Sequence, residues 1–413
     1  MSDFLRPAAS RLATAAAPAQ SVLAPAASEL PQAEFDPASL KILHILRAPL
    51  GGLFRHVLDV ACGQSQRGHR VGLIVDSTTG GARAEAILAD LTPSLALGLE
   101  RIAITRELGP SDVPALRQIS RRVKLLGPDV LHGHGAKGAA LARLASSAPR
   151  AIRVYTPHGG SLVYRPGTFM GGFYRSLEWL LKWRTDLFLF ESGYAASLFR
   201  AEMGRPPAMV RVVHNGVGEA EFASVSLRAD AADIVCVGEL RPVKAIDVLI
   251  EALALLKRSG RRVSAAIAGE GPESAALKAQ ALRLDVADQV RFIGYCPARE
   301  AFTMGRMLVI PSRAESLPYV VLEAAAAGVP IIATAVGGVP EIFGSQSDAL
   351  IPPDGAALAG AIAAALDDPA HTHRVAAAVR TRVRSEFSST VMVEAGLAAY
   401  REAIAMRKLA QFT

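Results

Sequence analysis

Cysteine is scarce in this sequence, and long apolar runs are absent from it. The 413 residues include only Cys62, Cys236 and Cys296, which lie far apart and form no C-x-x-C pair. This spacing argues against a disulfide framework or a thiolate zinc site, and it favours a reducing compartment such as the cytoplasm. No apolar stretch approaches the roughly 20 residues that a membrane-spanning helix needs.

The first 38 residues lack the pattern of a folded segment. They are rich in Ala, Pro and Ser, and prolines interrupt each apolar stretch. We therefore expect residues 1–38 to form a disordered tail, and we do not interpret them as a signal peptide.

Charge of one sign is not strongly in excess either. The 45 Lys and Arg residues exceed the 38 Asp and Glu residues, which gives a formal net charge of +7. This excess is spread along the chain, so it fits phosphorylated ligands or an anionic membrane surface without requiring nucleic acid. Hydrophobic residues make up 51% of the chain and charged residues 20%, which is typical of a globular protein, here of two or three domains.

Short apolar segments alternate with helical patterns from residue 39 onward. In residues 39–217, the segments predicted as strands are KILHIL, RVGLIVD, RIAIT, DVLHGH, RVYTPHG and LFLFES. Stretches between them, such as DVPALRQISRRVKLL and KGAALARLAS, are predicted helices. This alternation predicts an α/β domain with a parallel sheet and helices on both of its faces.

The same alternation restarts after a polar segment. Residues 218–233 have no clear pattern and are predicted to be a linker. Residues 234–385 then contain the strand candidates DIVCVGEL, VSAAIAGEG, VRFIGY, MLVIPS, PIIATAV and ALIPP, and residues 386–413 predict a helix that packs back on the first domain. Because ligands of parallel sheets bind at the carboxyl ends of the strands, two such doubly wound domains would face a central cleft.

The segment RAESLPYVVLEAAAAGVP begins a predicted helix after the strand MLVIPS. We expect this helix to span residues 317–327, with Ser316 as its N-cap and Pro318 in its first turn. Backbone N–H groups at a helix N-terminus, aided by the helix dipole, favour anions. The groups available here would be those of Leu317, Tyr319 and Val320.

Two glutamates lie on either side of this helix start. Glu315 precedes the helix and Glu323 lies two turns inside it, so they cannot form one carboxylate pair. They could instead flank a bound phosphate and accept hydrogen bonds from hydroxyl groups. Alternatively, Glu315 is an ordinary loop residue and Glu323 is solvated.

A loop with two cations follows another predicted strand. In VCVGELRPVKAIDVLIEALALL, Arg241 and Lys244 stand between the strand and an amphipathic helix. Two cations at the carboxyl end of a strand suggest a phosphate clamp, although both could simply solvate the loop.

The first half contains a glycine pair in a comparable place. Gly51 and Gly52 follow the strand KILHIL and open a helix, so they would allow the backbone to approach a phosphate closely. The pair is not a G-x-G-x-x-G fingerprint, which weakens a dinucleotide-binding interpretation. A simple turn is the alternative.

Histidines end two further strands of the first half. His132 and His134 alternate in HGHGAKG, so both could point the same way and suggest a metal site. No third ligand is evident, and the sequence has no D-x-D motif, so we expect no metal. In TPHGG, His158 stands beside two glycines that permit close approach, or it is a capped loop histidine.

Together these motifs resemble the retaining glycosyltransferases of family 4, which have the GT-B fold. The resemblance rests on G-E-L-x-x-x-K, A-G-E-G-P, F-I-G-Y and P-S-x-x-E-S-L-P-x-x-x-L-E-A-x-A-x-G-x-P, and it extends from residue 41 to about residue 400. It implies two Rossmann-like domains and a donor that is a nucleotide-diphosphate sugar, bound mainly by the second domain. It also implies transfer with retention, without a metal or another cofactor, to a glycan or a lipid-linked acceptor.

The resemblance assigns roles in the second domain. Glu315 would bind hydroxyls of the donor sugar and Glu323 the ribose, while Arg241 and Lys244 would neutralise the departing diphosphate. The backbone amides around Ser316 to Val320 would hold the same group. Gly269, Gly294 and Tyr295 would lie near the ribose and base, or they belong to ordinary tight turns.

This sequence departs from the family pattern in the cationic loop. The family has Arg directly after the glycine and Gly after the lysine, whereas these positions are Glu239 and Ala245 here. Arg241 would therefore supply the second cation of the clamp.

The resemblance also assigns roles in the first domain. Gly51 and Gly52 would contact the donor diphosphate, and His158 would face the donor sugar near the reacting carbon. His132, His134 and Lys137 would line the acceptor side of the cleft, and HNGV at residues 214–217 would act as a hinge. Charge that develops on the leaving diphosphate would be stabilised electrostatically.

Both tryptophans lie in one segment, residues 164–186, where aromatic residues alternate with cations. Such a mixture suits the inner face of the cytoplasmic membrane, where lipid-linked acceptors are found, although a helix docked on the first sheet is an equal alternative. The basic run at residues 117–126 could likewise be a solvated helix face.

Other classes of function remain compatible with the pattern. A nucleotide-sugar epimerase of GT-B fold would convert the donor without an acceptor, and a non-catalytic assembly subunit would bind no nucleotide sugar. A nicotinamide dehydrogenase would need the missing glycine fingerprint. The sequence does not identify the base, the sugar, the acceptor or the oligomeric state.

Overall fold

The structure is a computed structural model that describes residues 39–106, 109–146, 150–158 and 169–410. The expected disordered tail at residues 1–38 lies outside the described residues, as do Gly159, Gly160 and residues 164–168 of the aromatic segment.

The first half forms a seven-stranded parallel sheet in the order β3-β2-β1-β4-β5-β6-β7. Its strands are nearly continuous apolar runs, as expected when helices cover both faces. The strands are β1 (Lys41–Leu46), β2 (Arg70–Asp76), β3 (Gly98–Ile102), β4 (Val130–His134), β5 (Ile152–Thr156), β6 (Leu187–Phe190) and β7 (Met209–Val212).

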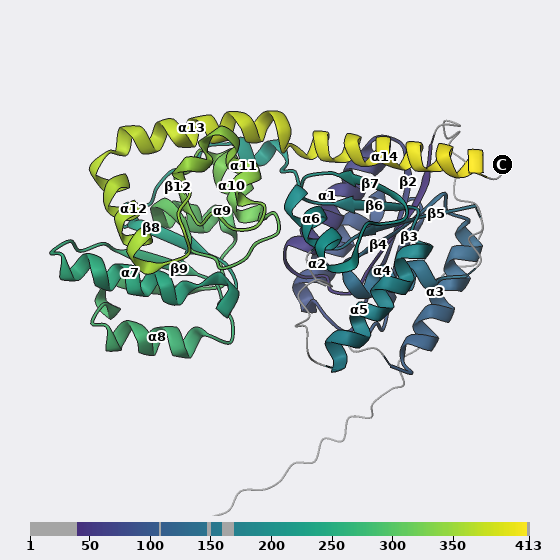
Figure 1. Cartoon of the computed structure of the whole chain (residues 1–413), viewed down its shortest axis with the longest axis horizontal. Coiled ribbons are helices and arrows are strands. Elements are labelled where there is room, and N and C mark those ends of the chain that lie inside the picture. Colours follow the sequence, from purple (N-terminus) through teal and green to yellow (C-terminus); the bar gives the residue numbers. More distant parts are fainter. Residues whose placement is uncertain (1–38, 107–108, 147–149, 159–168, 411–413) are drawn as a thin grey trace, which may run out of the picture. The chain divides into compact units, whose positions relative to one another are not determined.

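Helices lie on both sides of this sheet (Figure 1). The predicted helix DVPALRQISRRVKLL is confirmed, and a left-handed Gly127 ends it. The helices of this half are α1 (Gly51–Gln66), α2 (Gly81–Leu91), α3 (Asp112–Leu126), α4 (Gly135–Leu144), α5 (Phe169–Leu181) and α6 (Gly193–Met203).

The second half repeats the design with a five-stranded parallel sheet in the order β10-β9-β8-β11-β12. Its strands are β8 (Ala232–Val237), β9 (Ala265–Ala268), β10 (Val290–Gly294), β11 (Gly305–Ile310) and β12 (Ile331–Ala333). Its helices are α7 (Ile246–Arg258), α8 (Ser274–Arg283), α9 (Ala298–Ala301), α10 (Tyr319–Ala327), α11 (Val339–Phe343), α12 (Gly355–Asp367) and α13 (Pro369–Glu386).

Each sheet has one point where the strand order reverses direction. In the first sheet this point lies between β1 and β4, and in the second between β8 and β11. Ligands of doubly wound sheets bind beside such a point, at the carboxyl ends of the strands. The loops that follow β8 and β11 are those that carry the candidate residues Lys244 and Glu315.

The helix α14 (Ser389–Ala410) confirms the prediction that the C-terminal segment packs on the first half. Met392, Val393, Leu397 and Tyr400 belong to one buried cluster with residues of α1, β1, β4, β5 and β6. The contact is close, because a Cβ on Gly63 of α1 would lie 2.6 Å from a methyl group of Val393.

Three details differ from the sequence prediction. RIAIT is only partly a strand, because β3 begins three residues earlier, at Gly98. ALIPP forms no strand and contributes only an isolated bridge between Thr334 and Ile351. The polar segment 218–233 contains a short 3-10 helix, Glu219–Phe222, whose Phe222 is buried in the core of the second half.

The helices of the described residues include none that combines the length and apolar character needed to cross a membrane.

Candidate active site

Two candidate residues of the second sheet contact each other directly. Lys244 Nζ donates to Glu315 Oε1 at 2.6 Å, and Ser312 Oγ donates to the same oxygen at 2.6 Å. The Glu315 side chain is 9% exposed and that of Lys244 is 27% exposed. Glu315 is therefore a fixed acceptor within its loop rather than a freely solvated side chain.

The second cation of the same loop has a different environment. The Arg241 side chain is 55% exposed and lies 3.5 Å from a carboxylate oxygen of Glu239. After Lys244, the buried Ala245 has a left-handed φ of 52°, a conformation that glycine adopts more readily. The family's glycine at this position thus fits the backbone, and the alanine here holds a strain of roughly 1 kcal/mol.

The helix α10 begins at Tyr319, two residues later than predicted. Pro318 occupies the N-cap position without a side-chain cap. The prediction that Ser316 caps the helix is wrong, because Ser316 Oγ donates to Glu191 Oε1 at 2.5 Å instead. The first N–H groups of α10 therefore belong to Tyr319 and Val320, and Leu317 precedes the helix as a buried residue.

Two glycines pack closely against the backbone of the loop that carries Glu315. A Cβ on Gly337 would lie 1.6 Å from the Glu315 carbonyl oxygen, and one on Gly338 would lie 2.2 Å from that of Ser316. Gly338 N also donates to Ser316 O at 2.7 Å. Larger residues at either glycine would displace the loop that carries Glu315 and Ser316.

Glu323 lies in a cluster of charges that sequence reasoning missed. Arg55 of α1 donates to Glu323 at 3.3 Å, to Glu221 at 3.1 Å and to Asp59 at 2.7 Å. Burial, opposed by Arg55, raises the pKa of Glu323 to about 7. The Glu323 side chain is only 13% exposed, so the alternative of a solvated helix residue is wrong.

The glycine pair of the first half approaches the N-terminus of α10. Gly51 begins α1 with a positive φ of 63°, which a side chain would oppose. A Cβ on Gly52 would lie 3.5 Å from the ring of Tyr319, so the turn before α1 and the start of α10 are neighbours.

The turns after β9 and β10 are also close together. Gly269 and Gly294 form a bridge, and a Cβ on Gly269 would lie 1.8 Å from the carbonyl oxygen of Gly238. This close backbone contact requires glycine at position 269. It agrees with the alternative that Gly269 belongs to an ordinary tight turn. Tyr295 is 53% exposed, with the Arg83 guanidinium 4.3 Å from the centre of its ring.

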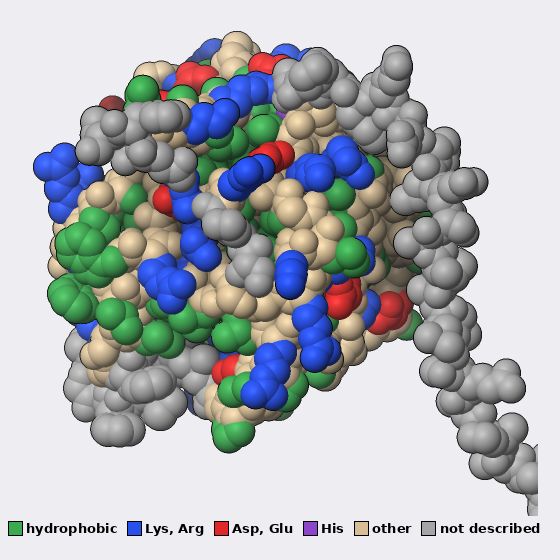
Figure 2. All heavy atoms as spheres, turned by 90° about the vertical axis from the view of Figure 1, so that its right-hand side faces the viewer, with side chains coloured by type: hydrophobic (Ala, Val, Ile, Leu, Met, Phe, Trp, Pro, Cys, Tyr) green, Lys and Arg blue, Asp and Glu red, His purple; other side chains and the backbone are tan. Residues whose placement is uncertain are grey.

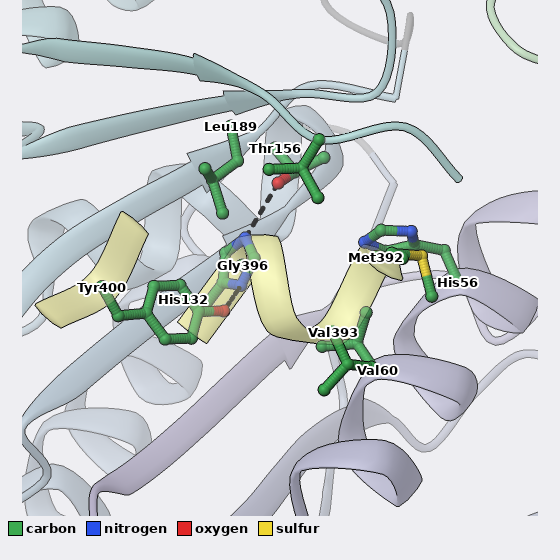
Figure 3. Close-up of a pocket in the computed structure, with 10 residues that line it drawn as sticks. His56, Val60, His132, Thr156, Leu189, Met392, Val393, Gly396 and Tyr400 are labelled. Carbon is green, nitrogen blue, oxygen red and sulfur yellow. Dashed lines mark hydrogen bonds between the residues drawn. The ribbon is translucent and has the colours of Figure 1, made fainter. Parts of the chain in front are cut away.

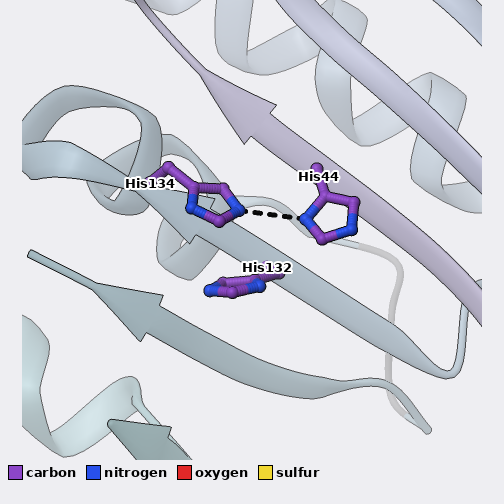
Figure 4. Close-up of side chains that lie close together, drawn as sticks. All are labelled: His44, His132 and His134. Carbon is purple, nitrogen blue, oxygen red and sulfur yellow. Dashed lines mark hydrogen bonds between the residues drawn. The ribbon is translucent and has the colours of Figure 1, made fainter. Parts of the chain in front are cut away.

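Strand register gathers histidines on one face of the first sheet. His44 of β1 pairs directly with His132 of β4, and His134 lies two residues further along the same face. The rings of His132 and His134 have their centroids 3.9 Å apart. Figure 4 shows the three side chains converging, with a hydrogen bond between His44 and His134.

Hydrogen bonds connect this cluster to His158. Gln64 Oε1 lies 2.9 Å from His44 Nε2, His44 Nδ1 lies 2.9 Å from His134 Nε2, and His134 Nδ1 lies 3.2 Å from His158 Nε2. The amide oxygen of Gln64 can only accept, so each ring in this series uses Nε2–H to donate and Nδ1 to accept. The series leaves Nδ1 of His158 as the nitrogen that faces away from the cluster.

His132 belongs to a separate branch of the cluster. Its Nδ1 lies 2.6 Å from the Tyr400 hydroxyl of α14 and its Nε2 lies 2.9 Å from Thr156 Oγ1. These residues and His56 line a small cavity of about 20 Å³, shown in Figure 3. Both ring nitrogens of His132 are hydrogen-bonded and the residue is buried. His132 is therefore a structural residue and does not contact an acceptor substrate.

Lys137 has a comparable structural role. It is buried at the start of α4 and its Nζ lies 2.5 Å from Asp112 Oδ1 of α3. The ion pair connects α3 with α4. This structural role explains the buried lysine without a contact to an acceptor substrate.

Burial keeps the histidines neutral. It lowers the pKa of His44 to about 4 and that of His56 to about 4. It also holds the pKa values of His132, His134 and His158 well below their usual range, with mutual repulsion as a smaller cause. The cluster is therefore a set of neutral imidazoles at pH 7.

His158 has further signs of a functional position. Its φ of 51° is left-handed, which is uncommon for a residue other than glycine and frequent at ligand sites. Nearby, Glu191 at the end of β6 is buried, and burial raises the pKa of its carboxyl group, to which the backbone N–H of His158 donates. Glu191 also accepts from Ser316, so it connects His158 to the Glu315 loop.

Two protein-family models match the chain. The model described as Glycosyltransferase Family 4 matches residues 50–221, and the model described as Glycosyl transferases group 1 matches residues 218–382. A glycogen synthase of Mycobacterium tuberculosis is 30% identical over 387 residues, which cover 85% of this chain and 92% of that protein. A D-inositol 3-phosphate glycosyltransferase of Kribbella flavida is 34% identical over 225 residues, covering 48% of this chain and 52% of that protein.

Solved structures share the fold at lower identity. Anabaena Alr3699/HepE in complex with UDP-glucose has a TM-score of 0.73 and 19% identity, covering 88% of this chain and all (100%) of that chain. Sucrose-phosphate synthase of Thermosynechococcus elongatus has a TM-score of 0.71 and 19% identity, covering 89% of this chain and 100% of that chain. These likenesses confirm the predicted GT-B fold.

The neutral histidines predict a loss of stability in acid. Because the pKa of His44 is about 4 in the folded protein and the ordinary pKa of a histidine is 6.5, the unfolded state binds more protons between these pH values. The free energy of unfolding should therefore fall as the pH falls from 6.5 to 4, by about 3 kcal/mol for this one residue. Urea unfolding of the wild type and His44→Asn at pH 7, 6 and 5 measures the difference.

The exposed His371 of α13 provides the matched control for this series. His371→Asn should keep the pH dependence of the wild type, whereas His44→Asn should reduce it by the share of one histidine. Equal slopes for His44→Asn and the wild type would contradict the neutral cluster.

Proposed function

The chain belongs to the glycosyltransferases of family 4, and from this premise we propose how it acts. It transfers a sugar from a nucleotide-diphosphate sugar to a glycan or a lipid-linked acceptor, with retention of anomeric configuration, in polysaccharide or glycolipid biosynthesis. The observation that carries the proposal is the contact of Lys244 with Glu315 beside the N-terminus of α10.

The donor site combines fixed charge with free backbone donors. Lys244, the exposed Arg241 and the first N–H groups of α10 can surround a diphosphate. These groups supply the positive charge that a leaving diphosphate needs, so the proposal includes no metal and no other cofactor. A uridine donor is the first to test, since Anabaena Alr3699/HepE has been crystallised with UDP and with UDP-glucose.

The remaining candidates surround this diphosphate. We assign Glu315 to hydroxyls of the donor sugar, because Lys244 and Ser312 fix its Oε1 and orient the carboxylate, so that Oε2 can accept from a hydroxyl group. Glu323 binds the ribose, and Arg55 orients its carboxylate. His158 accepts a hydrogen bond from the sugar through Nδ1, the nitrogen left over by the histidine series.

The chemical step follows from where charge develops. As the bond from the anomeric carbon to the diphosphate breaks, the negative charge on the diphosphate increases and Lys244 and Arg241 stabilise it. The acceptor hydroxyl attacks from the same face and passes its proton to the leaving phosphate oxygen. This order retains the anomeric configuration without a covalent carboxylate intermediate.

An exposed apolar cluster supports peripheral contact with a membrane. Trp179, Leu180 and Trp183 are 53%, 59% and 63% exposed. The alternative of a helix docked on the first half holds for the opposite face of α5, where Glu178 forms a buried ion pair with Arg143 at 2.7 Å. The segment thus docks by one face and presents aromatic residues on the other; the side chains of Phe169, Phe173 and Tyr174 lie outside the described residues.

Cations accompany these aromatic residues in the same half. Arg117, Arg121 and Lys124 line a surface hollow beside α3. Figure 2 shows the side of the molecule on which α3 and the end of α14 lie, where Lys and Arg side chains are frequent and hydrophobic side chains gather beside them. Such a surface suits the anionic inner face of a cytoplasmic membrane.

The donor site predicts which ligands stabilise the protein. In a thermal-shift panel of UDP-, GDP-, ADP- and TDP-sugars, one nucleotide class should raise the midpoint of unfolding by mass action. Lys244→Ala should reduce this ligand-induced shift and lower kcat by about 100-fold, because one stabilising charge at the leaving group is lost. The shift is compared with each variant's own midpoint, since Glu315 also loses its partner.

Lys278→Ala on the exposed face of α8 is the matched control, and it should keep both the ligand-induced shift and kcat. A Lys244→Ala variant with the turnover and the ligand-induced shift of the wild type would remove the clamp from the proposal.

The membrane surface predicts binding to anionic vesicles at low salt. Trp179→Ala with Trp183→Ala should reduce cosedimentation with phosphatidylglycerol vesicles roughly tenfold, because two interfacial anchors are lost. Leu282→Ala removes an even more exposed apolar residue of the second half, at 70% exposure, and should have no effect. Wild-type protein that stays wholly in the supernatant would show that this surface does not bind membranes.

A further inference from the structure

Three imidazoles from separate elements converge beside the proposed donor site. His56 comes from α1, His134 from the end of β4 and His158 from the turn after β5. One nitrogen from each ring lies within 4.8 Å of the others. Sequence reasoning found only the pair His132 and His134, because the third partners stand on other elements.

The spacing suits a tetrahedral metal ion. His134 Nδ1 and His158 Nε2 are 3.2 Å apart. Two nitrogens bound to zinc at about 2.0 to 2.1 Å in tetrahedral geometry stand roughly 3.3 Å apart. These two ligand atoms are thus already at the separation that zinc requires.

The outer hydrogen bonds of His56 prepare it to be a ligand. Its Nδ1 lies 3.0 Å from Asn215 Oδ1, while Asn215 Nδ2 donates to the Leu317 carbonyl at 2.9 Å. The second bond fixes the orientation of the amide, so His56 Nδ1 carries the proton and Nε2 carries a lone pair. Metal-binding histidines usually donate their other N–H to an oxygen in this way.

The outer bonds of His134 have the same effect. Its Nε2–H donates to His44 Nδ1, and His44 in turn donates to Gln64 Oε1. The lone pair of His134 is therefore on Nδ1, the atom that faces His158. In His158, a shift of the proton from Nε2 to Nδ1 leaves a lone pair on Nε2. This lone pair is the third that the ion needs.

The alternative group of His44, His132 and His134 is less suited to an ion. Both nitrogens of His132 are bonded to hydroxyl groups. All three rings of this group are buried, whereas His158 of the other group is only partly buried.

We propose that His56, His134 and His158 form a binding site for one Zn²⁺ ion, with a fourth position open to water. Three neutral imidazoles suit zinc and related ions of the first transition row. If the donor contact of His158 in the proposed function is correct, zinc on Nε2 leaves the proton of His158 on Nδ1, which can then no longer accept a hydrogen bond from the sugar. Zinc then inhibits the enzyme by weakening the binding of its donor.

Direct binding to the full chain tests the site without any sugar substrate. Titration of Zn²⁺ against a chromophoric chelator should show one ion per chain in the wild type. His56→Asn and His158→Asn should each weaken affinity by more than roughly 100-fold, because a ligand is lost. His132→Asn should change it only a few-fold, and a variant with both His371→Asn and His373→Asn should bind as the wild type does.

A spectrum of the wild type keeps the test independent of how the variants fold. Co²⁺ should give visible bands of tetrahedral intensity without a band from thiolate ligation. A chain that binds no Zn²⁺, a stoichiometry that persists in His56→Asn and His158→Asn, or a spectrum of six-coordinate Co²⁺ would overturn the site.

Competition with the nucleotide sugar tests the inhibition by zinc separately from the proposed function. A nucleotide sugar that binds in the thermal-shift panel should weaken the affinity for Zn²⁺ about tenfold when present at ten times its Kd. Zinc affinity that is unchanged by such a donor would overturn the inhibition and leave the role of Lys244 untouched.

Discussion

The parallel pairing of β8 with β11 is the constraint on which the proposed donor site depends. Parallel strands place their carboxyl ends at the same edge of a sheet, so the loops after β8 and β11 meet there. Lys244 and Glu315 then form an ion pair that is mostly shielded from solvent, beside the N-terminus of α10. The pair keeps a carboxylate in place without a ligand, and an incoming diphosphate would meet a lysine that is already oriented.

The first sheet uses the same constraint differently. Pairing of β1 with β4 places His44 beside His132, and α1 adds His56 above them. In this buried environment the rings remain neutral, and His44, His134 and His158 hydrogen-bond to one another in series. The result is a rigid series of tautomers that ends at His158, so residues remote from the donor site determine which nitrogen His158 presents. The helix α14 completes the cluster through Tyr400.

Local patterns were sufficient to place most strands, and to place Lys244 and Glu315 in loops that follow strands, because apolar runs and strand-end loops are properties of neighbouring residues. Local patterns did not predict contacts between residues that lie far apart in the sequence. Ser316 looked like an N-cap, yet its hydroxyl donates to Glu191, which follows β6. Glu323 was predicted as a ligand-binding residue with solvation as the alternative, and neither interpretation included its contact with Arg55 of α1. No local signal marks such contacts, since they arise only when the two halves of the chain are folded.

A crystal structure of the protein with a bound nucleoside diphosphate would test the central assignment most directly. The account predicts that the diphosphate lies within hydrogen-bond distance of Lys244 Nζ and of the backbone N–H groups of Tyr319 and Val320. A diphosphate bound elsewhere, with the Lys244–Glu315 pair unoccupied by any ligand, would contradict it.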